Sequence, residues 1–249
     1  MLSVSRSDHR LVHALRVINM QADIAPQAMG SLLISFGNTQ VICAVNIEDG
    51  VPRWMKEQKI TGGWLTAEYS MLPYSTKPRK SRMALQGRFD GRSMEIQRLI
   101  GRSLRAAIDL EMLGARTISV DCDVLQADGG TRTAAITGAS VAIALALQQL
   151  VQKKELVAHP MKKLVAAVSV GILRGEVLLD LDYSEDRDAQ VDLNLVMNES
   201  LEFIELQASG EESVFHHDQL SLMLEYGREG ISQLLEKQRS FLEEKQIFF

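Results

Sequence analysis

The chain is poor in proline and cysteine. Its 249 residues include five prolines and two cysteines. Because prolines are few and no linker is evident, we expect one compact domain over residues 1–249. Cys43 and Cys122 each lie in a strand-like apolar pattern without CxxC spacing. We therefore expect reduced cysteines that pack in the core, and neither a disulfide nor a metal site.

Long apolar runs are also missing. No run approaches the roughly 18 residues that a membrane-spanning helix needs. The N-terminal sequence MLSVSRSDHR lacks the apolar core of a signal peptide. We therefore expect a soluble cytoplasmic protein with no membrane partner. The sequence contains no Walker motif, GxGxxG pattern or zinc-ligand spacing, so none of these motifs assigns a function.

A glycine-rich turn is the most informative feature that is present. Residues 117–127 (TISVDCDVLQA) alternate apolar and polar side chains, which predicts a strand, and DGGTRTAAITG follows over residues 128–138. The glycines allow another group to approach closely. We expect Thr131 or Thr133 to cap a helix that continues to about Leu150.

Two interpretations of this turn stay open. The free N–H groups at the start of such a helix form an anion site, and Arg132 adds a rigid fork of donors suited to phosphate. The alternative is a tight strand-to-helix turn with an exposed arginine, because glycine turns with capping threonines are common.

Positive charge is concentrated in one segment. The net charge is −5, but residues 77–105 contain nine basic and two acidic residues, so that segment carries +7 and the rest of the chain −12. A basic patch on an acidic body is typical of RNA-binding proteins. A basic helix face paired with acidic neighbours explains the pattern equally well.

A helix is predicted from Gly91 to Gly114, after a long loop over residues 74–90. Arg92 falls in its first turn, where it can point into a site or face solvent. The buried stripe is expected to comprise Met94, Leu99, Ile100, Leu104, Ile108 and Leu110 or Met112. Three arginines share another face, which could meet a partner, RNA or acidic groups: Arg98, Arg102 and Arg105.

Strand pairs are predicted on both sides of the glycine turn. One hairpin spans residues 31–47 around Gly37–Asn38, and a second joins residues 164–173 to residues 176–183. Residues 201–207 predict one more strand, and residues 218–244 a final amphipathic helix. The last apolar residues, 247–249, are expected to pack on a neighbour.

Acidic residues gather after the second hairpin. They lie on one face of two strands and in the loop between them: Asp180, Asp182, Asp186, Asp188 and Asp192. Such a cluster suits a hard divalent cation, although the spacing is not that of an EF-hand. The alternative is a solvated acidic turn. Together with the glycine turn, the cluster would also suit a small-molecule kinase, which consumption of ATP would reveal.

Long motifs resemble those of the bacterial RNase PH family. In chain order they are GNTQVICAV, EDGVPRW, GGWLTAEYSMLP, GRSMEIQRLIGRSLRA, VDCDVLQADGGTRTAAITGA, VSVGI and LDLDYSEDRDAQVDLN. The resemblance extends from about residue 6 to the final helix. It implies an α+β fold, in which a single RNase PH-like domain of mixed sheets backed by helices assembles into a homo-hexameric ring, a trimer of dimers.

The resemblance also implies an activity. Members of the family are tRNA nucleotidyltransferases, phosphate-dependent 3′→5′ exoribonucleases that trim the 3′ ends of tRNA precursors. Inorganic phosphate is the co-substrate, a nucleoside diphosphate is released, and the reaction is reversible. The alternative is a non-catalytic RNA-binding ring subunit, as some exosome relatives are. Such subunits tend to lack the phosphate-binding arginines or the aspartate pair, which are present here.

Site residues follow from the matching motif positions. Four residues match the family's phosphate-binding positions: Arg92, Gly130, Thr131 and Arg132. Arg132 is also expected to be catalytic. Asp186 and Asp192 match the catalytic carboxylates and would bind Mg²⁺, with Asp180 and Asp182 as weaker candidates behind them. Arg79 and Arg82 match basic residues that help assembly and tRNA binding.

Two positions depart from the family pattern. Tyr74 stands where arginine commonly follows MLP, and His9 stands where glycine is common in the N-terminal RPDGR element. These departures concern the grip on RNA and the ring contacts, because the phosphate and metal positions are intact.

Overall fold

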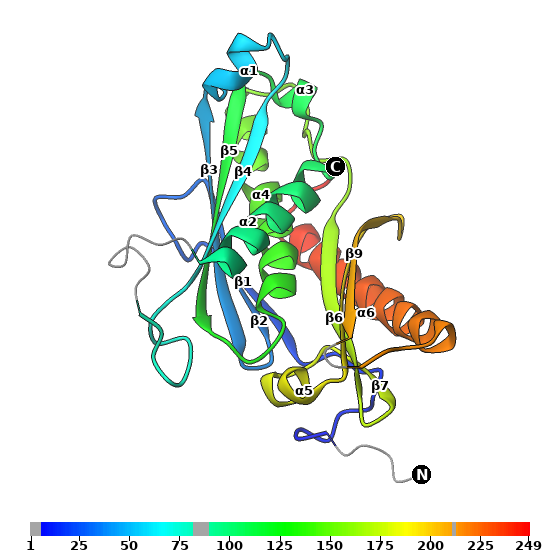
Figure 1. Cartoon of the computed structure of the whole chain (residues 1–249). Helices are drawn as coiled ribbons and strands as arrows, with labels where there is room; N and C mark the ends of the chain where they lie inside the picture. Colours follow the sequence, from blue (N-terminus) through cyan, green and yellow to red (C-terminus); the bar gives the residue numbers. More distant parts are fainter. Residues whose placement is uncertain (1–5, 82–89, 211–212) are drawn as a thin grey trace.

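The computed structural model describes residues 6–81, 90–210 and 213–249. Within these ranges the chain forms two β-sheets with helices between and beside them (Figure 1). The expected α+β class, mixed sheets backed by helices, is therefore confirmed.

The first sheet has five strands in the order β1-β2-β3-β5-β4. They are β1 (Ile18–Ala22), β2 (Gly30–Phe36), β3 (Thr39–Asp49), β4 (Trp64–Met71) and β5 (Arg116–Gln126). β4 runs parallel to β5, whereas the other neighbours are antiparallel. β2 and β3 form the predicted hairpin, whose turn places Gly37 at a φ of +55° that glycine adopts without strain.

The second sheet has four antiparallel strands in the order β7-β6-β8-β9. They are β6 (Val165–Leu173), β7 (Glu176–Leu179), β8 (Val191–Asn198) and β9 (Phe203–Gly210). β6 and β7 form the second predicted hairpin. β7 ends earlier than expected, because Asp180 has a φ of +54° and turns the chain out of the strand.

Three long helices build the layers around these sheets. α4 (Thr131–Gln152) contacts both sheets, α2 (Gly91–Arg105) packs on β4 and α4, and α6 (His217–Glu244) packs on the second sheet (Figure 1). By length and composition alone, α4 could cross a membrane, but 78% of its most apolar stretch is buried inside the molecule. A helix that is apolar all round is expected between two sheets. The described residues also form three short helices: α1 (Arg53–Glu57), α3 (Leu110–Leu113) and α5 (Tyr183–Asp188).

The helix predicted from Gly91 to Gly114 is interrupted. α2 ends at Arg105 and the separate α3 follows, because the intervening backbone pairs with a distant segment: the Lys162 N–H donates to the Ala107 carbonyl, and Ile108 bridges to Met161. The buried side of this segment also differs from the predicted stripe. Met94 and Met112 are exposed, and Ile96 is buried beside the predicted leucines and Ile100.

The predicted acidic loop contains the short helix α5. Asp182 and Glu185 form a reciprocal cap: the Asp182 carboxylate accepts from the Glu185 N–H at 2.9 Å, and the Glu185 carboxylate accepts from the Asp182 N–H at 3.0 Å. This capping box satisfies donors at the helix start and fixes where the helix begins.

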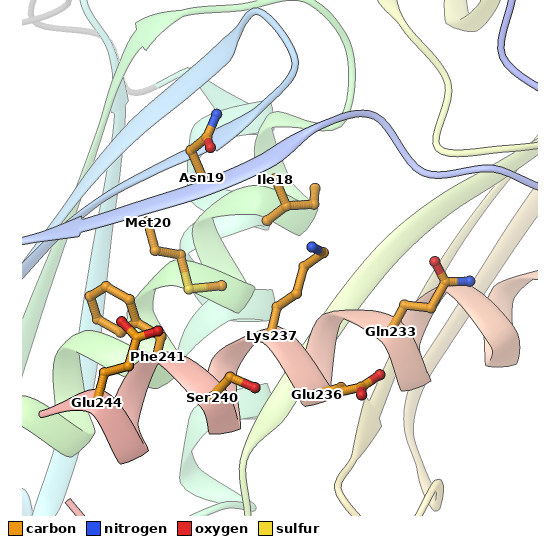
Figure 2. A pocket seen from close by; sticks show the side chains of 9 residues that line it. All are labelled: Ile18, Asn19, Met20, Gln233, Glu236, Lys237, Ser240, Phe241 and Glu244. Carbon is orange, nitrogen blue, oxygen red and sulfur yellow. The ribbon is translucent and has the colours of Figure 1, made fainter. Parts of the chain in front are cut away.

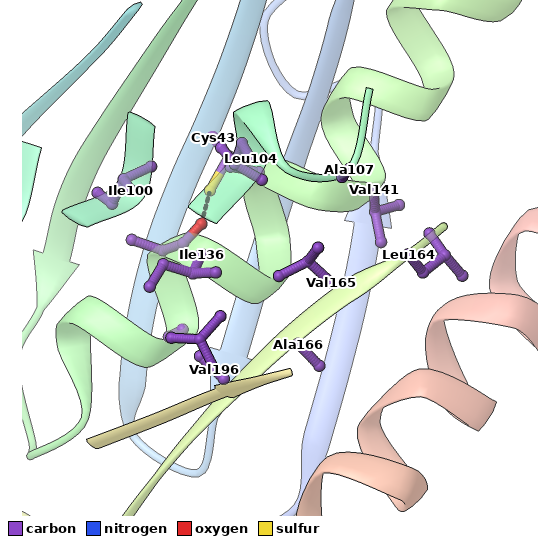
Figure 3. Packing of buried hydrophobic residues seen from close by; sticks show 14 of the residues in the cluster. Cys43, Ile100, Leu104, Ala107, Ile136, Val141, Leu164, Val165, Ala166 and Val196 are labelled. Carbon is purple, nitrogen blue, oxygen red and sulfur yellow. Dashed lines mark hydrogen bonds between the residues drawn. The ribbon is translucent and has the colours of Figure 1, made fainter. Parts of the chain in front are cut away.

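The core lies around α4, between the sheets. Figure 3 shows Ile136 and Val141 of α4 among buried residues of both sheets, such as Cys43 of β3 and Val165 of β6. Cys43 and Cys122 are directly opposite on β3 and β5; both are buried free thiols with sulfur atoms 3.9 Å apart. The expectation of reduced packing cysteines is confirmed.

The C-terminal tail packs on its own chain. Ile247 is buried in the core, and the Phe249 ring stacks on His159 with centroids 4.6 Å apart. Phe248 alone among these three residues is largely exposed. The expectation that the tail packs on a neighbour is therefore wrong for Ile247 and Phe249. His216 is the N-cap of α6.

Candidate active site

A cavity of about 1250 Å³ opens where the glycine turn meets α5 and β8. Its lining comes from the start of α2, the segment after β4, the glycine turn, α5 and β8. Six of the residues predicted from the sequence line it: Arg92, Gly130, Thr131, Arg132, Asp186 and Asp192. Residues up to 100 positions apart in the chain thus meet in one place.

The glycine turn forms one wall of the cavity. Gly130 is the N-cap of α4 with a φ of +65°, and Gly129 has a φ of +75°. The expected threonine cap is absent: the Thr133 hydroxyl donates to the Gly130 carbonyl at 2.9 Å, and Thr131 Oγ1 lies 2.7 Å from Tyr69 Oη. The side-chain oxygens are engaged elsewhere, so the first-turn N–H groups of α4 provide the donors on this wall.

Two arginines bring positive charge to the same wall. Arg132 lies one residue inside α4, where its guanidinium is 3.5 Å from Glu95 Oε1 and donates to Gln207 Oε1 at 3.2 Å. Arg92 lies in the first turn of α2 and is exposed. Burial raises the pKa of the Tyr69 hydroxyl behind the wall, while the Thr131 hydrogen bond and the charges of Arg92 and Arg132 act to lower it. Both charges therefore act on the same buried group.

The acidic wall consists of Asp186 and Asp192. Asp186 is on α5, and its backbone N–H donates to the Asp182 carbonyl at 2.8 Å. Asp192 is on β8, and its Oδ2 accepts a 3.0 Å hydrogen bond from Asn194 Nδ2. Both residues are half-buried and line the cavity, and Asp192 Oδ1 itself is shielded from solvent.

The other acidic residues of the predicted cluster have structural partners. Asp180 is fully buried and forms an ion pair with Arg16, and Asp182 caps α5. Asp188 is exposed and pairs with Arg187. The expectation that these residues converge on one cation is wrong, because each of the three is held by a partner of its own.

The residues present fit one mode of magnesium binding. Among the described residues, no group of three or more His, Cys, Asp or Glu side chains is placed to hold a metal ion. Magnesium is commonly bound by only one or two carboxylates together with substrate phosphates and water. Asp186 and Asp192 line one cavity and provide two such carboxylates.

The basic segment divides between the cavity and the protein's own acidic groups. Lys77, Lys80 and Arg92 line the cavity. Arg102 pairs with Glu205, and Arg105 donates to the Leu65 carbonyl while stacking over Trp64. The pairing of Arg102 with Glu205 agrees with the second interpretation for that residue, and the RNA-binding interpretation stays a prediction. Arg79 is exposed, and Arg82 lies outside the described residues.

Sequence reasoning missed further residues of the cavity. They are polar or aromatic side chains from turns and strands: Asn38, Ser169, Tyr183, Arg187 and Asn194. The DYSE segment (residues 182–185) carried a usable signal, since its spacing is that of a capping box and predicts the short helix that carries Tyr183 and Arg187. Ser169, in the middle of an apolar strand, gives no such signal.

A second hollow of about 590 Å³ lies between β1 and α6. Figure 2 shows that it is lined by Met20 and Phe241 among mixed charged residues of α6, such as Lys237 and Glu236. The six residues predicted to bind phosphate or metal lie in the other cavity. The larger cavity is therefore the candidate site.

The fold is of the α+β class. Its cavity places cationic side chains and backbone N–H donors opposite a pair of carboxylates. The chain belongs to the 3′ exoribonuclease family: residues 14–147 match domain 1 of that family, and residues 163–230 match domain 2. The expectation of a single domain over residues 1–249 stays a prediction.

Solved structures share this fold. Rrp46 of rice (Oryza sativa) is 22% identical with a TM-score of 0.74, and the match covers 95% of this chain and 100% of that one. The Archaeoglobus fulgidus exosome with RNA bound to the active site is 21% identical with a TM-score of 0.79, covering 94% and 92%. An archaeal exosome core is 21% identical with a TM-score of 0.77, covering 94% and 91%. The RNase PH-like fold is thereby established.

Proposed function

We infer that this protein is a phosphate-dependent 3′→5′ exoribonuclease of the RNase PH type. The observation that carries this inference is the meeting of Arg92, Arg132 and the α4 N-terminus with Asp186 and Asp192 in one cavity. This set provides binding for two anionic groups, inorganic phosphate and the terminal phosphodiester. No nucleophilic side chain is required, because phosphate itself attacks.

In the reaction, an oxygen of inorganic phosphate attacks the phosphorus of the last phosphodiester bond. The bond to the 3′-oxygen of the preceding nucleotide breaks, that oxygen takes a proton, and a nucleoside diphosphate leaves. Arg92 and Arg132 hold the phosphate nucleophile in line and offset its charge, and the first-turn N–H groups of α4 donate to it. The reverse reaction uses the same groups to add a nucleotide.

The aspartates serve the other side of the scissile bond. Asp186 and Asp192 would hold Mg²⁺, which offsets charge on the scissile phosphate and the leaving oxygen. Asn194 donates to Asp192 Oδ2 and thereby fixes the orientation of that carboxylate. Arg132 belongs to both the phosphate site and the catalytic set, because it contacts the group that reacts.

The substrate and the assembly form part of the same proposal. We propose tRNA precursors with 3′ extensions as substrates, with Lys77 and Lys80 at the cavity, and Arg79 and Arg82 near it in sequence, attracting the RNA backbone. Exosome structures of the same fold include one with RNA bound to the active site. We also propose a homo-hexameric ring, as a trimer of dimers, and a cytoplasmic location.

The test is the product released from a 3′-extended tRNA with Mg²⁺, in the presence and absence of inorganic phosphate. Phosphate-dependent release of nucleoside diphosphate is the expected result. Release of nucleoside monophosphate without phosphate would mean hydrolysis and would contradict the roles of Arg92 and Arg132. No product at all from the purified assembly would favour the alternative, a non-catalytic RNA-binding ring subunit.

A further inference from the structure

A buried arginine lies directly behind the glycine turn. Arg16 is 5% exposed, and its backbone N–H and side chain make three hydrogen bonds to the fully buried Asp180 carboxylate. The distances are 2.8 Å from the backbone N–H, 3.0 Å from Nε and 2.7 Å from NH2. Burial acts to lower the pKa of Arg16, but Asp180 and two other carboxylates raise it, so the guanidinium stays charged.

The same guanidinium binds the backbone of the turn. Arg16 NH1 donates to the Asp128 carbonyl at 2.5 Å, and NH2 contacts the Gly129 carbonyl at 3.4 Å. Thr39, the first residue of β3 and fully buried, holds the same turn: its hydroxyl donates to the Gly129 carbonyl at 2.7 Å and accepts from the Asp128 N–H at 2.9 Å.

These contacts determine where the next N–H groups point. The peptide unit is planar and trans, so a carbonyl held on one side directs the following N–H to the other side. Because Arg16 and Thr39 hold the Gly129 carbonyl, the Gly130 N–H points away from them. Gly130 lines the cavity and begins α4, so this peptide sets the direction of the anion-binding end of the helix.

Asp180 connects the buried contacts of Arg16 to the acidic wall of the cavity. Its backbone carbonyl accepts from Arg6 and Arg10 at 3.1 and 3.2 Å, and Arg6 also pairs with Glu185 of the α5 cap at 2.7 Å. In Figure 1 the blue N-terminal segment runs beside α5 and the end of β7. One buried network thus joins the glycine turn to the helix that carries Asp186.

We propose that Arg16, held by Asp180, and Thr39 are positioning residues that orient the glycine turn for inorganic phosphate. They lie behind the turn and act through its backbone. This inference rests on the proposed phosphorolysis, and it adds residues from three separate segments of the chain to that site.

The test uses two pairs of variants. Thr39→Val removes only a hydroxyl. Thr137→Val is its matched control, since Thr137 is equally buried. Its hydroxyl likewise donates to a carbonyl and accepts from an N–H, both of Ala167, at 3.3 and 3.0 Å. Arg16→Lys keeps the positive charge but loses the planar guanidinium, whose N–H groups bind Asp180 and the turn at the same time. Arg116→Lys is its control, because Arg116 binds the Leu113 carbonyl and pairs with Asp49 at the far end of β5.

The readouts are the KM for inorganic phosphate at saturating RNA, kcat, RNA affinity, and the rise in unfolding midpoint that inorganic phosphate produces. A small displacement of a binding group lowers reactivity by up to about 100-fold. We expect Thr39→Val and Arg16→Lys to raise the KM for phosphate by about 10-fold to 100-fold. They should also lose the phosphate-induced rise in midpoint while retaining RNA affinity. The two controls should keep the wild-type KM and midpoint rise.

The outcomes separate the positioning role of Arg16 and Thr39 from the proposed function. If all four variants share the wild-type KM, the positioning role is overturned and the proposed function stands. If the wild type releases no diphosphate, the proposed function fails, and the midpoint rise alone tests the positioning role. If phosphate raises the midpoint of Thr39→Val and Arg16→Lys as much as that of the wild type, the positioning role is overturned. If Arg16→Lys does not fold, the threonine pair decides the question.

Discussion

Gly129 lies against the backbone of Leu181, and there is no room for a side chain between them. A Cβ placed on Gly129 would be 2.5 Å from the Leu181 carbonyl oxygen and 2.6 Å from the carbonyl carbon of Asp182. The glycine turn and the entrance to α5 are thus in direct contact. This contact brings the phosphate wall and the aspartate wall together, although the two are separated by more than 50 residues.

Gly129→Ala is therefore expected to lower both stability and activity. Gly175→Ala is the matched control: Gly175 also has a positive φ, of +83°, but a Cβ there would meet nothing within 4 Å. An L side chain in the left-handed region costs about 1–2 kcal/mol at either site. The clash should add to this cost only at Gly129. Denaturant unfolding measures the loss of unfolding free energy in each variant. Equal costs for the two variants would contradict the close approach.

Arg132→Ala is expected to abolish phosphorolysis while the protein stays folded. Removing one donor to a developing negative charge lowers kcat by about 100-fold to 1000-fold, or about 2.7–4 kcal/mol. Arg98→Ala is the control, because Arg98 is exposed on α2 outside the described cavity lining. Steady-state rates with a short 3′-extended tRNA measure the effect. Trimming by Arg132→Ala at the wild-type rate would disprove the assignment.

The cap of α5 should make stability depend on acid. Burial acts to raise the pKa of Asp182, but hydrogen bonds from the Glu185 N–H, Ser184 and Ser7 outweigh it and hold the pKa below its usual 3.8. A depressed pKa gives stability that is present above pH 3.8 and is lost as the pH falls through the folded-state value. Asp182→Ala should cost about 0.5–2 kcal/mol at pH 7.

The measurement is denaturant unfolding of wild type and Asp182→Ala between pH 7 and pH 3. The gap in unfolding free energy should be constant down to about pH 4 and narrow below it. A gap that widens in acid would show that the Asp182 carboxylate destabilises the cap.

A ring assembly predicts a mass of six chains. β9 is an edge strand, and it exposes Phe203 (60%) and Leu206 (46%). Exposed apolar side chains on a sheet edge are typical of interaction surfaces. Light scattering at micromolar concentration should give six times the 27.7 kDa chain mass. A monomer under these conditions would contradict the proposed hexamer.

Local signals in the sequence predicted much of this fold. The Gly37–Asn38 turn, the β5 alternation and the glycine turn placed the β2–β3 hairpin, β5 and α4 correctly. Each depends on residues within a few positions of one another. The cavity residues named from the family motifs were also brought together, although their roles stay predictions.

Features that depend on distant contacts were missed. The break after α2 follows from the pairing of Ala107 with Lys162, which the apolar periodicity does not reveal. The burial of Asp180 follows from its ion pair with Arg16, 164 positions away, so an alternating strand pattern placed it wrongly with the cluster of acids around Asp186. The threonine cap was wrong because Gly130 itself, in the left-handed conformation, occupies the N-cap position.

The most direct test of the central claim follows the phosphorus atom of the co-substrate. Wild-type protein is incubated with a 3′-extended tRNA, Mg²⁺ and radiolabelled inorganic phosphate, and the released nucleotides are separated. If phosphate is the nucleophile, the label appears in the β-phosphate of the nucleoside diphosphate. Release of unlabelled nucleoside monophosphate would show that water attacks, and would contradict the account.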